Sequence, residues 1–268
     1  MGSISMSLEV ELHKKAGKVC PQAANGEIRC PLIVRQTSED VVTGTVFGIL
    51  RHIRPHLWLG PLLNEAFQTT TFQQVWYKEL SLRFWERQSR FPPELLDFRE
   101  GKSEIDLIIE WENKPTTIWV EAKLLSELAT GTTHSCDNDQ VARGVRTLLA
   151  ATGHIQPNRL FHQTKRRPLW LALLAEKPHD LVERYRQGMA IGGICTEPAP
   201  APPPAEMIGT ITWSDIREVV TTHRRLMNPT EYDMSKRLTQ YLDLKLHELK
   251  EQRDLSKRTV SLPLLSGM

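Results

Sequence analysis

The sequence predicts an α/β protein in which a mixed sheet carries helices on both faces and a C-terminal helical extension follows. Three observations support this prediction. Two strand patterns, 104–111 and 116–124, are separated by a short turn, Glu112 to Pro115. A near-continuous apolar run at 168–175 is typical of a central strand covered on both faces. Helical periodicity before and after these strands makes the two element types alternate along the chain.

These patterns divide the chain into three parts. Residues 1–36 are polar and interrupted by glycine and proline, which predicts an N-terminal arm or tail. Residues 37–225 form the expected folded domain, including a proline-rich loop at 197–205. Residues 226–268 form a C-terminal helical extension and tail.

Composition excludes several classes of protein. The chain has 268 residues, of which 40% are hydrophobic and 25% charged, as in ordinary globular proteins rather than disordered ones. No apolar run approaches the ~20 residues of a membrane helix, and the N-terminus lacks the apolar core of a secretory signal. We therefore expect a cytoplasmic protein without membrane partners. Its four cysteines show no zinc-binding spacing.

The first elements are two helices and a strand. A helix should begin near Thr37, with Val42, Val46 and Ile49 on its buried face, and end before Pro55. A second helix is expected over 61–68. Within 76–88, alternating apolar residues indicate a strand. We expect both Trp76 and Trp85 to lie in the core; the alternative for these two and for Trp119 is an exposed ring that stacks on bases.

Later elements complete the sheet and its helices. Helices are predicted at 137–151, 178–188 and 214–224, and a strand at 208–213. The last helix should start with Asn228 as its cap and Pro229 in its first turn and run to about Gln252. Its leucine stripe suits packing on its own domain or on a second copy, and we predict a homodimer contact there.

The strand pair 104–111 and 116–124 segregates its side chains cleanly. With a symmetric turn, opposed residues sum to 227, which places Asp106 opposite Glu121, with Cβ atoms ~5 Å apart. Because side chains alternate between faces, Lys123 shares the face of Glu121. The polar face then holds Glu104, Asp106, Ile108, Glu110, Thr117, Trp119, Glu121 and Lys123. The opposite, core face holds Ile105, Leu107, Ile109, Trp111, Ile118, Val120, Ala122 and Leu124.

Two carboxylates this close repel each other unless a cation lies between them. Mg²⁺ binds one or two carboxylates together with water and phosphate oxygens, and it can activate water for hydrolysis. A neighbouring lysine can stabilise developing charge. The alternative is a solvated sheet face with a Glu–Lys ion pair. Because Lys123 lies on the carboxylate face and not on the apolar face, we expect Lys123→Ala to slow the chemical step ~10²–10³-fold while changing stability by less than ~0.5 kcal/mol.

The order of elements and the motif Asp106, then Glu121-Ala122-Lys123, followed by Gln140 on the next helix, resemble the PD-(D/E)XK nuclease superfamily with its restriction-endonuclease-like fold. The resemblance covers about 37–175 and extends toward 224. It implies a nuclease that uses Mg²⁺ or Mn²⁺, with Asp106, Glu121 and the Ala122 carbonyl as metal ligands. Lys123 then positions the attacking water or stabilises charge, and Gln140 lies near the site.

The chain departs from the family pattern in two places. Ile105 stands where the motif has proline. The long segment at 54–75 leaves open which upstream acid belongs to the site. Our first choice is Glu39 and our second is Glu79, while Glu104 is a further candidate for the metal shell. The alternatives are a helix-terminal acid for Glu39 and surface carboxylates for the other two.

The resemblance also bears on partners. DNA is the expected substrate rather than RNA, with backbone phosphates held by Arg143 or by the run Lys165, Arg166 and Arg167. By analogy, a role in genome (phage) defence or DNA processing is expected. The alternative function is a nuclease-fold binding or scaffold subunit with weak or lost catalysis.

Overall fold

The computed structural model describes residues 39–88, 96, 103–124, 126–131, 139–155, 166–175, 179–191 and 205–260. The predictions for the arm at 1–36, for 197–204 of the proline-rich loop, for the tail at 261–268 and for Lys165 concern positions outside these ranges. Everything that follows concerns the described residues.

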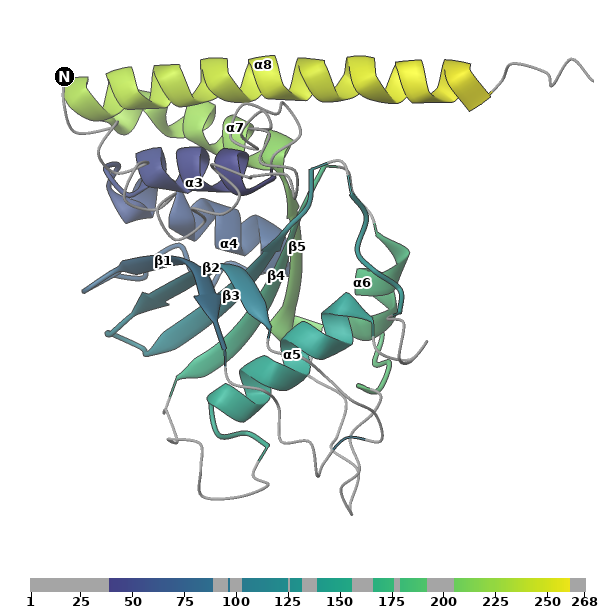
Figure 1. Ribbon diagram of the computed structural model, residues 1–268. Helices are drawn as coiled ribbons and strands as arrows, with labels where there is room; N and C mark the ends of the chain where they lie inside the picture. The colour runs from purple at the N-terminus through teal and green to yellow at the C-terminus, as the bar shows by residue number, and fades with distance from the viewer. Residues whose placement is uncertain are drawn as a thin grey trace, which may run out of the picture.

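A five-stranded mixed sheet forms the centre of the protein (Figure 1). Its strands lie in chain order: β1 (Ser81–Arg87), β2 (Glu104–Trp111), β3 (Thr116–Ala122), β4 (Arg167–Leu174) and β5 (Ile208–Thr212). The first three form an antiparallel meander, and β4 and β5 join in parallel. The apolar run at 168–175 is thus a buried strand, as predicted.

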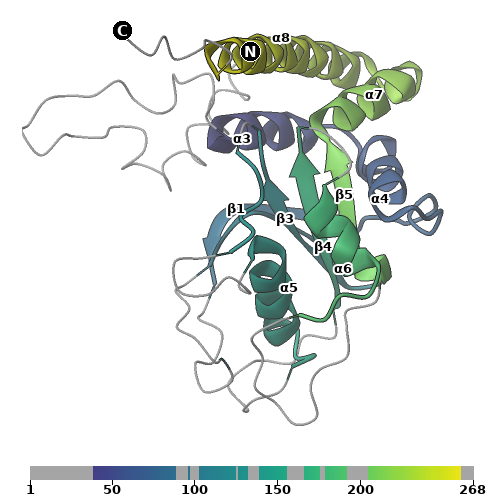
Figure 2. The ribbon, with the colours of Figure 1, turned by 90° about the vertical axis from the view of Figure 1, so that its right-hand side faces the viewer.

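Helices cover both faces of the sheet (Figures 1 and 2). On one face lie α3 (Glu39–Leu50), α4 (Leu59–Phe67), α7 (Trp213–His223) and α8 (Pro229–Val260), with the short turns η2 (Pro55–Leu57) and η5 (Arg224–Leu226). On the other face lie α5 (Gln140–Ala151) and α6 (Asp180–Arg186), and η4 (Ala205–Met207) leads into β5. The predicted α/β class, with a mixed sheet flanked by helices, is confirmed.

Two apolar cores result, one on each side of the sheet. The first core packs Val46, Trp58 and Val120 with residues of α7 and α8. The second core packs Val141 and Val145 of α5 against Ile108 and Trp119. The face predicted to be polar is therefore buried in its middle, because α5 covers Ile108 and Trp119. The charged residues remain at its ends.

The register of β2 and β3 is the predicted one. Pairs run from Trp111–Thr116 to Leu107–Val120, each summing to 227. Pairing stops there, one residue short of Asp106 and Glu121. Beyond that point the alternation breaks, because Ile105 joins the second core whereas Leu107 lies in the first. The placement of Ile105 on the same face as Leu107 was wrong, since β2 leaves β3 at this level.

The two tryptophans around β1 differ from each other. Trp85 is buried as predicted, but Trp76 precedes the strand and its side chain is 79% exposed, so its core placement was wrong. Trp85 has a left-handed backbone with φ of 51° and lies between the pairs Phe84–Leu107 and Glu86–Ile105. That conformation is costly for a bulky residue. With this backbone conformation the Trp85 side chain points into the first core, at the level of Asp106 on the neighbouring strand.

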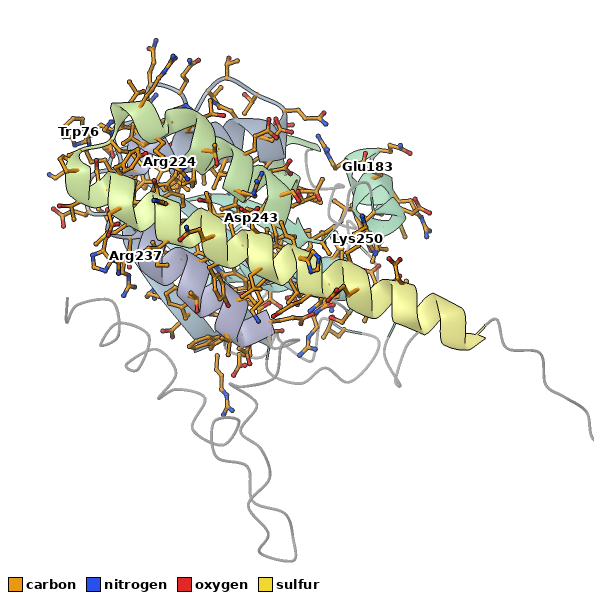
Figure 3. All side chains as sticks on the ribbon, turned by 90° about the horizontal axis from the view of Figure 1, so that it is seen from above. Trp76, Glu183, Arg224, Arg237, Asp243 and Lys250 are labelled. Carbon is orange, nitrogen blue, oxygen red and sulfur yellow. The ribbon has the colours of Figure 1, made fainter. Side chains whose placement is uncertain are left out.

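The final helix is longer than predicted and packs on its own domain. It spans 32 residues, about 48 Å, and crosses the layer of α3 and α7 (Figure 3). Leu238, Leu242 and Leu249 are buried in the first core. Asn228 caps it as predicted, because its side chain accepts the Glu231 amide at 3.0 Å. The homodimer contact stays a prediction. Among the described helices, none has the length and apolar character needed to cross a membrane.

Candidate active site

The backbone groups of Ala122 and Lys123, at the end of β3, determine how the candidate site is arranged. Asp106 Oδ2 accepts the Ala122 amide at 2.9 Å, in the place where a strand-to-strand bond would otherwise form. The amide and carbonyl of one strand residue point to the same side, so the Ala122 carbonyl also faces the gap that β2 leaves. The next amide, of Lys123, bonds Leu173 of β4 at 2.7 Å, and Trp213 donates to the Lys123 carbonyl at 3.0 Å.

The predicted side chains converge at this point. Lys123 Nζ lies 2.6 Å from Glu121 Oε1, and the Gln140 side-chain amide donates to the same oxygen at 2.5 Å. Both Glu121 and Lys123 are largely buried, with side chains only 15% and 13% exposed. The structure thus brings together Asp106, Glu121, Lys123 and Gln140.

Gln140 is held by a network that the sequence did not indicate. It begins α5, and its side-chain oxygen accepts the Ala129 amide at 3.1 Å. The helix is capped by Asp139, which accepts the Ala142 amide at 2.8 Å and the Tyr185 hydroxyl at 2.6 Å. An aspartate directly before the helix was the available signal for the cap. The contact with Tyr185 depends on tertiary packing.

Of the two candidate upstream acids, Glu39 lies beside the site, where its charge acts on Glu121 and Lys123. It begins α3, and its Oε1 accepts the Leu124 amide at 2.9 Å and the Ser126 hydroxyl at 2.6 Å. Its carboxylate therefore fixes the segment that follows Lys123. Glu79 lies elsewhere, because its neighbour Lys78 bonds Asn113 in the turn between β2 and β3. Glu104 lies 3.5 Å from Arg87, with which it forms an ion pair.

Burial dominates the electrostatics of the site. Burial, reinforced by the charge of Glu121, raises the pKa of Asp106 to about 7. Burial also raises the pKa of Glu121 above its ordinary value, against the opposing effect of Lys123. Burial lowers the pKa of Lys123, but Glu121 and Asp106 outweigh it, so the amine stays a cation with a raised pKa. Two carboxylates and one cation leave an excess of negative charge in a poorly solvated place.

An excess of negative charge in a buried place is what a bound metal cation would compensate, so we compared the donor atoms present with those that metals prefer. Within the described ranges, no group of three or more His, Cys, Asp or Glu side chains is placed to hold a metal ion. Two carboxylates and the Ala122 carbonyl form a smaller set. Mg²⁺ suits such a set, because it usually keeps several waters and completes its shell with substrate phosphate oxygens. The donor set fits a hard divalent cation.

The predicted phosphate-binding residues separate in space. Arg143 lies on α5 near Glu121, whose pKa it lowers, and its Nε donates to Ser103 at 3.0 Å. Arg167 pairs with Thr116 in the sheet register, whereas Glu121 pairs with Ala172. Five residues of strand, about 17 Å, therefore separate Arg167 from the site.

Arg166 is engaged at that same distant end. It bonds the Trp111 carbonyl at 2.9 Å and forms an ion pair with Glu112. Arg166 and Arg167 therefore do not border Asp106 and Glu121. A phosphate contact at these two arginines stays a prediction and concerns a surface separate from the site. Among the predicted phosphate-binding residues that the structure describes, only Arg143 lies beside the site.

Comparison with known proteins does not identify a family or a function for this chain. No family model matches the chain, and neither the curated proteins nor the solved structures contain a significant match. What the site can do chemically is read from its own residues.

Proposed function

We propose that this protein is a divalent-metal-dependent nuclease that hydrolyses phosphodiester bonds of DNA. One observation carries the proposal: Asp106, Glu121 and Lys123 converge where β2 leaves β3, in a place that desolvates their charges. The resemblance of the motif and element order to the PD-(D/E)XK nucleases supports it. A cytoplasmic role in genome defence or DNA processing is part of the proposal by analogy.

The proposed metal follows from the chemistry of the donor set. Asp106, Glu121 and the Ala122 carbonyl would hold Mg²⁺ or Mn²⁺. When bound, the ion supplies charge neutralisation at the phosphate and a more acidic water. The Asp106 carboxylate is oriented for this by the Ala122 amide at 2.9 Å. The raised pKa of Asp106 means that the charged carboxylate is costly until a cation compensates it.

The surrounding side chains have distinct roles in the proposal. Lys123 remains protonated and mostly buried, so its amine can orient the attacking water or stabilise charge that develops on the phosphate. Gln140 holds Glu121 from the other side and limits its rotation. Glu39 fixes the backbone after Lys123, and Arg143 supplies a cation at the edge of the site.

The test is cleavage of plasmid, single-stranded DNA and RNA with Mg²⁺ or Mn²⁺, against EDTA controls. Asp106→Asn and Glu121→Gln keep side-chain volume and should each slow cleavage at least ~100-fold. Glu110→Gln is the matched control, because Glu110 lies on the same strand as Asp106 but pairs with Arg83 at its other end. Wild-type cleavage by Asp106→Asn would refute the site.

The same experiment tests the alternative of a binding or scaffold subunit. Such a subunit would bind nucleic acid or metal without cutting any of the three substrates. A melting temperature that rises with Mg²⁺, together with no cleavage under any condition, would favour it over the nuclease.

A further inference from the structure

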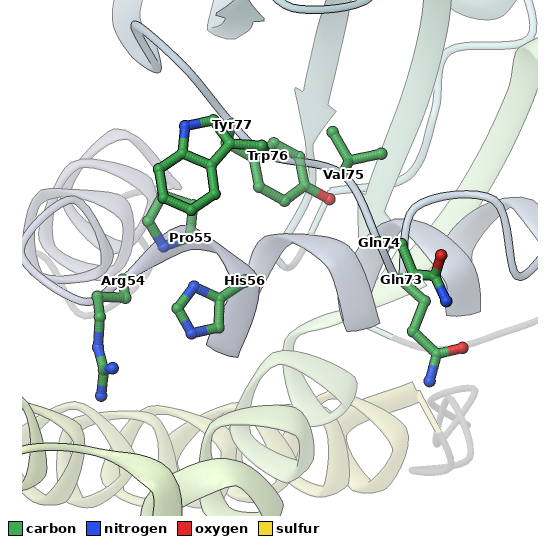
Figure 4. Close-up of a pocket in the computed structure, with 8 residues that line it drawn as sticks. All are labelled: Arg54, Pro55, His56, Gln73, Gln74, Val75, Trp76 and Tyr77. Atoms are coloured by element: carbon green, nitrogen blue, oxygen red, sulfur yellow. The ribbon is translucent and has the colours of Figure 1, made fainter.

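A second site lies at the opposite end of the sheet from the carboxylates. A pocket of about 550 Å³ opens between η2 and the segment 73–77, which precedes β1 (Figure 4). This volume lies in the range of small-molecule sites. Arg54 is at one end of the pocket in this view, Gln73 and Gln74 at the other, with His56 and Trp76 between them.

Trp76 is an unusual residue to find at such an opening. Its side chain is 79% exposed, whereas the other six tryptophans, namely Trp58, Trp85, Trp111, Trp119, Trp170 and Trp213, are at most 4% exposed. A large aromatic surface left in water costs free energy that burial against a ligand would recover. Trp76 thus contributes nothing evident to the core and offers a free π face.

The segment that carries Trp76 is held in place. Tyr77 donates its hydroxyl to the Phe72 carbonyl at 3.1 Å, and its ring contacts Trp111 edge to face at 5.1 Å. The Lys78 amide bonds the Asn113 side chain at 2.9 Å. The backbone that carries Trp76 is therefore anchored, which lowers the cost of ordering this segment when a ligand binds.

The opposite wall is equally fixed. Arg54 Nε lies 2.9 Å from Glu231 Oε1 and 3.1 Å from its Oε2, and Arg54 Nη2 bonds the Leu226 carbonyl at 2.7 Å. Glu231 is the third residue of α8, which begins at Pro229, so the start of α8 anchors this wall. Within the described residues, Arg54 Nη1 forms no hydrogen bond, and its donors remain for a ligand.

The chemistry of the lining indicates the ligand class. It combines an exposed indole, an imidazole, two carboxamides and one guanidinium, and the carboxylate of Glu231, which pairs with this guanidinium, is not part of the lining. Planar bases stack on aromatic side chains, and carboxamides bond base edges. The Arg54 guanidinium is already paired with Glu231, so what it offers a phosphate is a hydrogen bond from Nη1 rather than a bidentate clamp. We propose that this pocket binds a nucleobase together with its phosphate, with the base stacked on Trp76.

Two sources offer this chemistry: a free nucleotide and a base of a nucleic-acid strand. If the base belongs to a nucleic-acid strand, the proposal rests on the proposed function, and the pocket is a second contact for the nuclease substrate. About 17 Å or more of β3 separates the pocket end of the sheet from Glu121. A strand reaching both would be held at two points.

The experiment is binding to the full chain in EDTA, where cleavage is switched off. Tryptophan emission is followed during titration with adenosine monophosphate in one arm and an unlabelled oligodeoxyadenylate in the other. Because Trp76 is the exposed tryptophan, we expect the fraction quenched by ligand to match the fraction quenched by iodide. Quenching by the mononucleotide identifies a nucleotide pocket, and quenching by the oligonucleotide alone identifies a strand contact. Quenching by neither overturns the proposal.

Variants supply a readout that is independent of the indole's own emission. Anisotropy of a labelled oligonucleotide should show at least about fivefold weaker binding for Trp76→Ala and a smaller loss for Trp76→Phe, since one base stack is removed or reduced. Leu244→Ala, a 57% exposed residue of α8, is the matched control. Equal binding by Trp76→Ala and Leu244→Ala overturns the proposal.

The pocket and the carboxylate site can fail separately. Asp106→Asn abolishes cleavage under the proposed function but should leave quenching in EDTA unchanged. A protein that cuts DNA yet shows no quenching refutes only the pocket. A Trp76→Ala change that alters self-association in sedimentation, with nucleotide binding intact, shows a protein-binding surface and also refutes it.

Discussion

Lys123→Met is the substitution for which the sequence pattern and the structure predict the most different loss of stability. It keeps most of the side-chain stem and removes the charge. On an exposed strand face the change would cost less than ~0.5 kcal/mol. In the structure, Lys123 is 13% exposed and lies 2.6 Å from a Glu121 carboxylate that is 15% exposed. The substitution therefore leaves a buried carboxylate beside Asp106 without its cation.

The magnitude follows from the geometry. Two unit charges at the observed 2.6 Å attract by about 6 kcal/mol at an effective dielectric constant of 20. Desolvation of both groups cancels much of this attraction. Removing one partner of a buried pair typically costs ~3–5 kcal/mol. Because this pair keeps some contact with water, we expect Lys123→Met to lower the free energy of unfolding by ~2 kcal/mol at about pH 8.

The cost should depend on pH in a defined direction. Burial and Glu121 raise the pKa of Asp106 to about 7, and burial raises the pKa of Glu121 as well. Near pH 5.5 one carboxyl group of Asp106 and Glu121 takes up a proton, so removal of the lysine leaves less negative charge uncompensated. We expect the destabilisation to fall to ~1 kcal/mol or less at that pH.

The assay is urea unfolding in EDTA at both pH values, with wild type, Lys123→Met, Glu121→Gln and the double variant. The double variant should recover most of the loss, because no unpaired charge remains. Lys78→Met, a change at an exposed lysine, is the control. If Lys123→Met and Lys78→Met shift stability equally at pH 8, the lysine is solvated and the reasoning fails.

Five further outcomes are expected. Asp106→Asn should raise the metal-free melting temperature and weaken its dependence on pH. An acid whose pKa is raised by folding destabilises the protein increasingly as pH rises toward about 7, so wild type should weaken from pH 5 to 8. Mg²⁺ should stabilise wild type more at pH 8 than at pH 5, and Asp106→Asn at neither. Arg143→Ala should weaken DNA binding more than Arg166→Ala, measured as Kd against salt, because Arg166 is already paired with Glu112. Tyr185→Phe should cost ~1–2 kcal/mol in urea unfolding by depriving buried Asp139 of a donor. Light scattering at tens of micromolar should show a dimer that contacts through 229–260, and a monomeric mass would reject it.

The sequence by itself determined the local geometry of the candidate site. The turn at 112–115 and the alternation of apolar residues set the register of β2 and β3, and this register places Asp106 level with Glu121. Alternation then placed Lys123 beside Glu121, as their 2.6 Å contact shows. Such features are predictable because strand pairing across a short turn is a local property with a period of two residues.

Only the tertiary structure decided how much water these groups meet. Cover by α5 buries Trp119 and Ile108 on the face that alternation marked as polar, and the same helix brings Gln140 to Glu121. The parallel pairing of β4 moves Arg166 and Arg167 to the far end of the sheet, and the held segment before β1 leaves Trp76 in solvent. Burial and distance depend on which distant elements pack together, and a residue pattern along one strand does not contain that information.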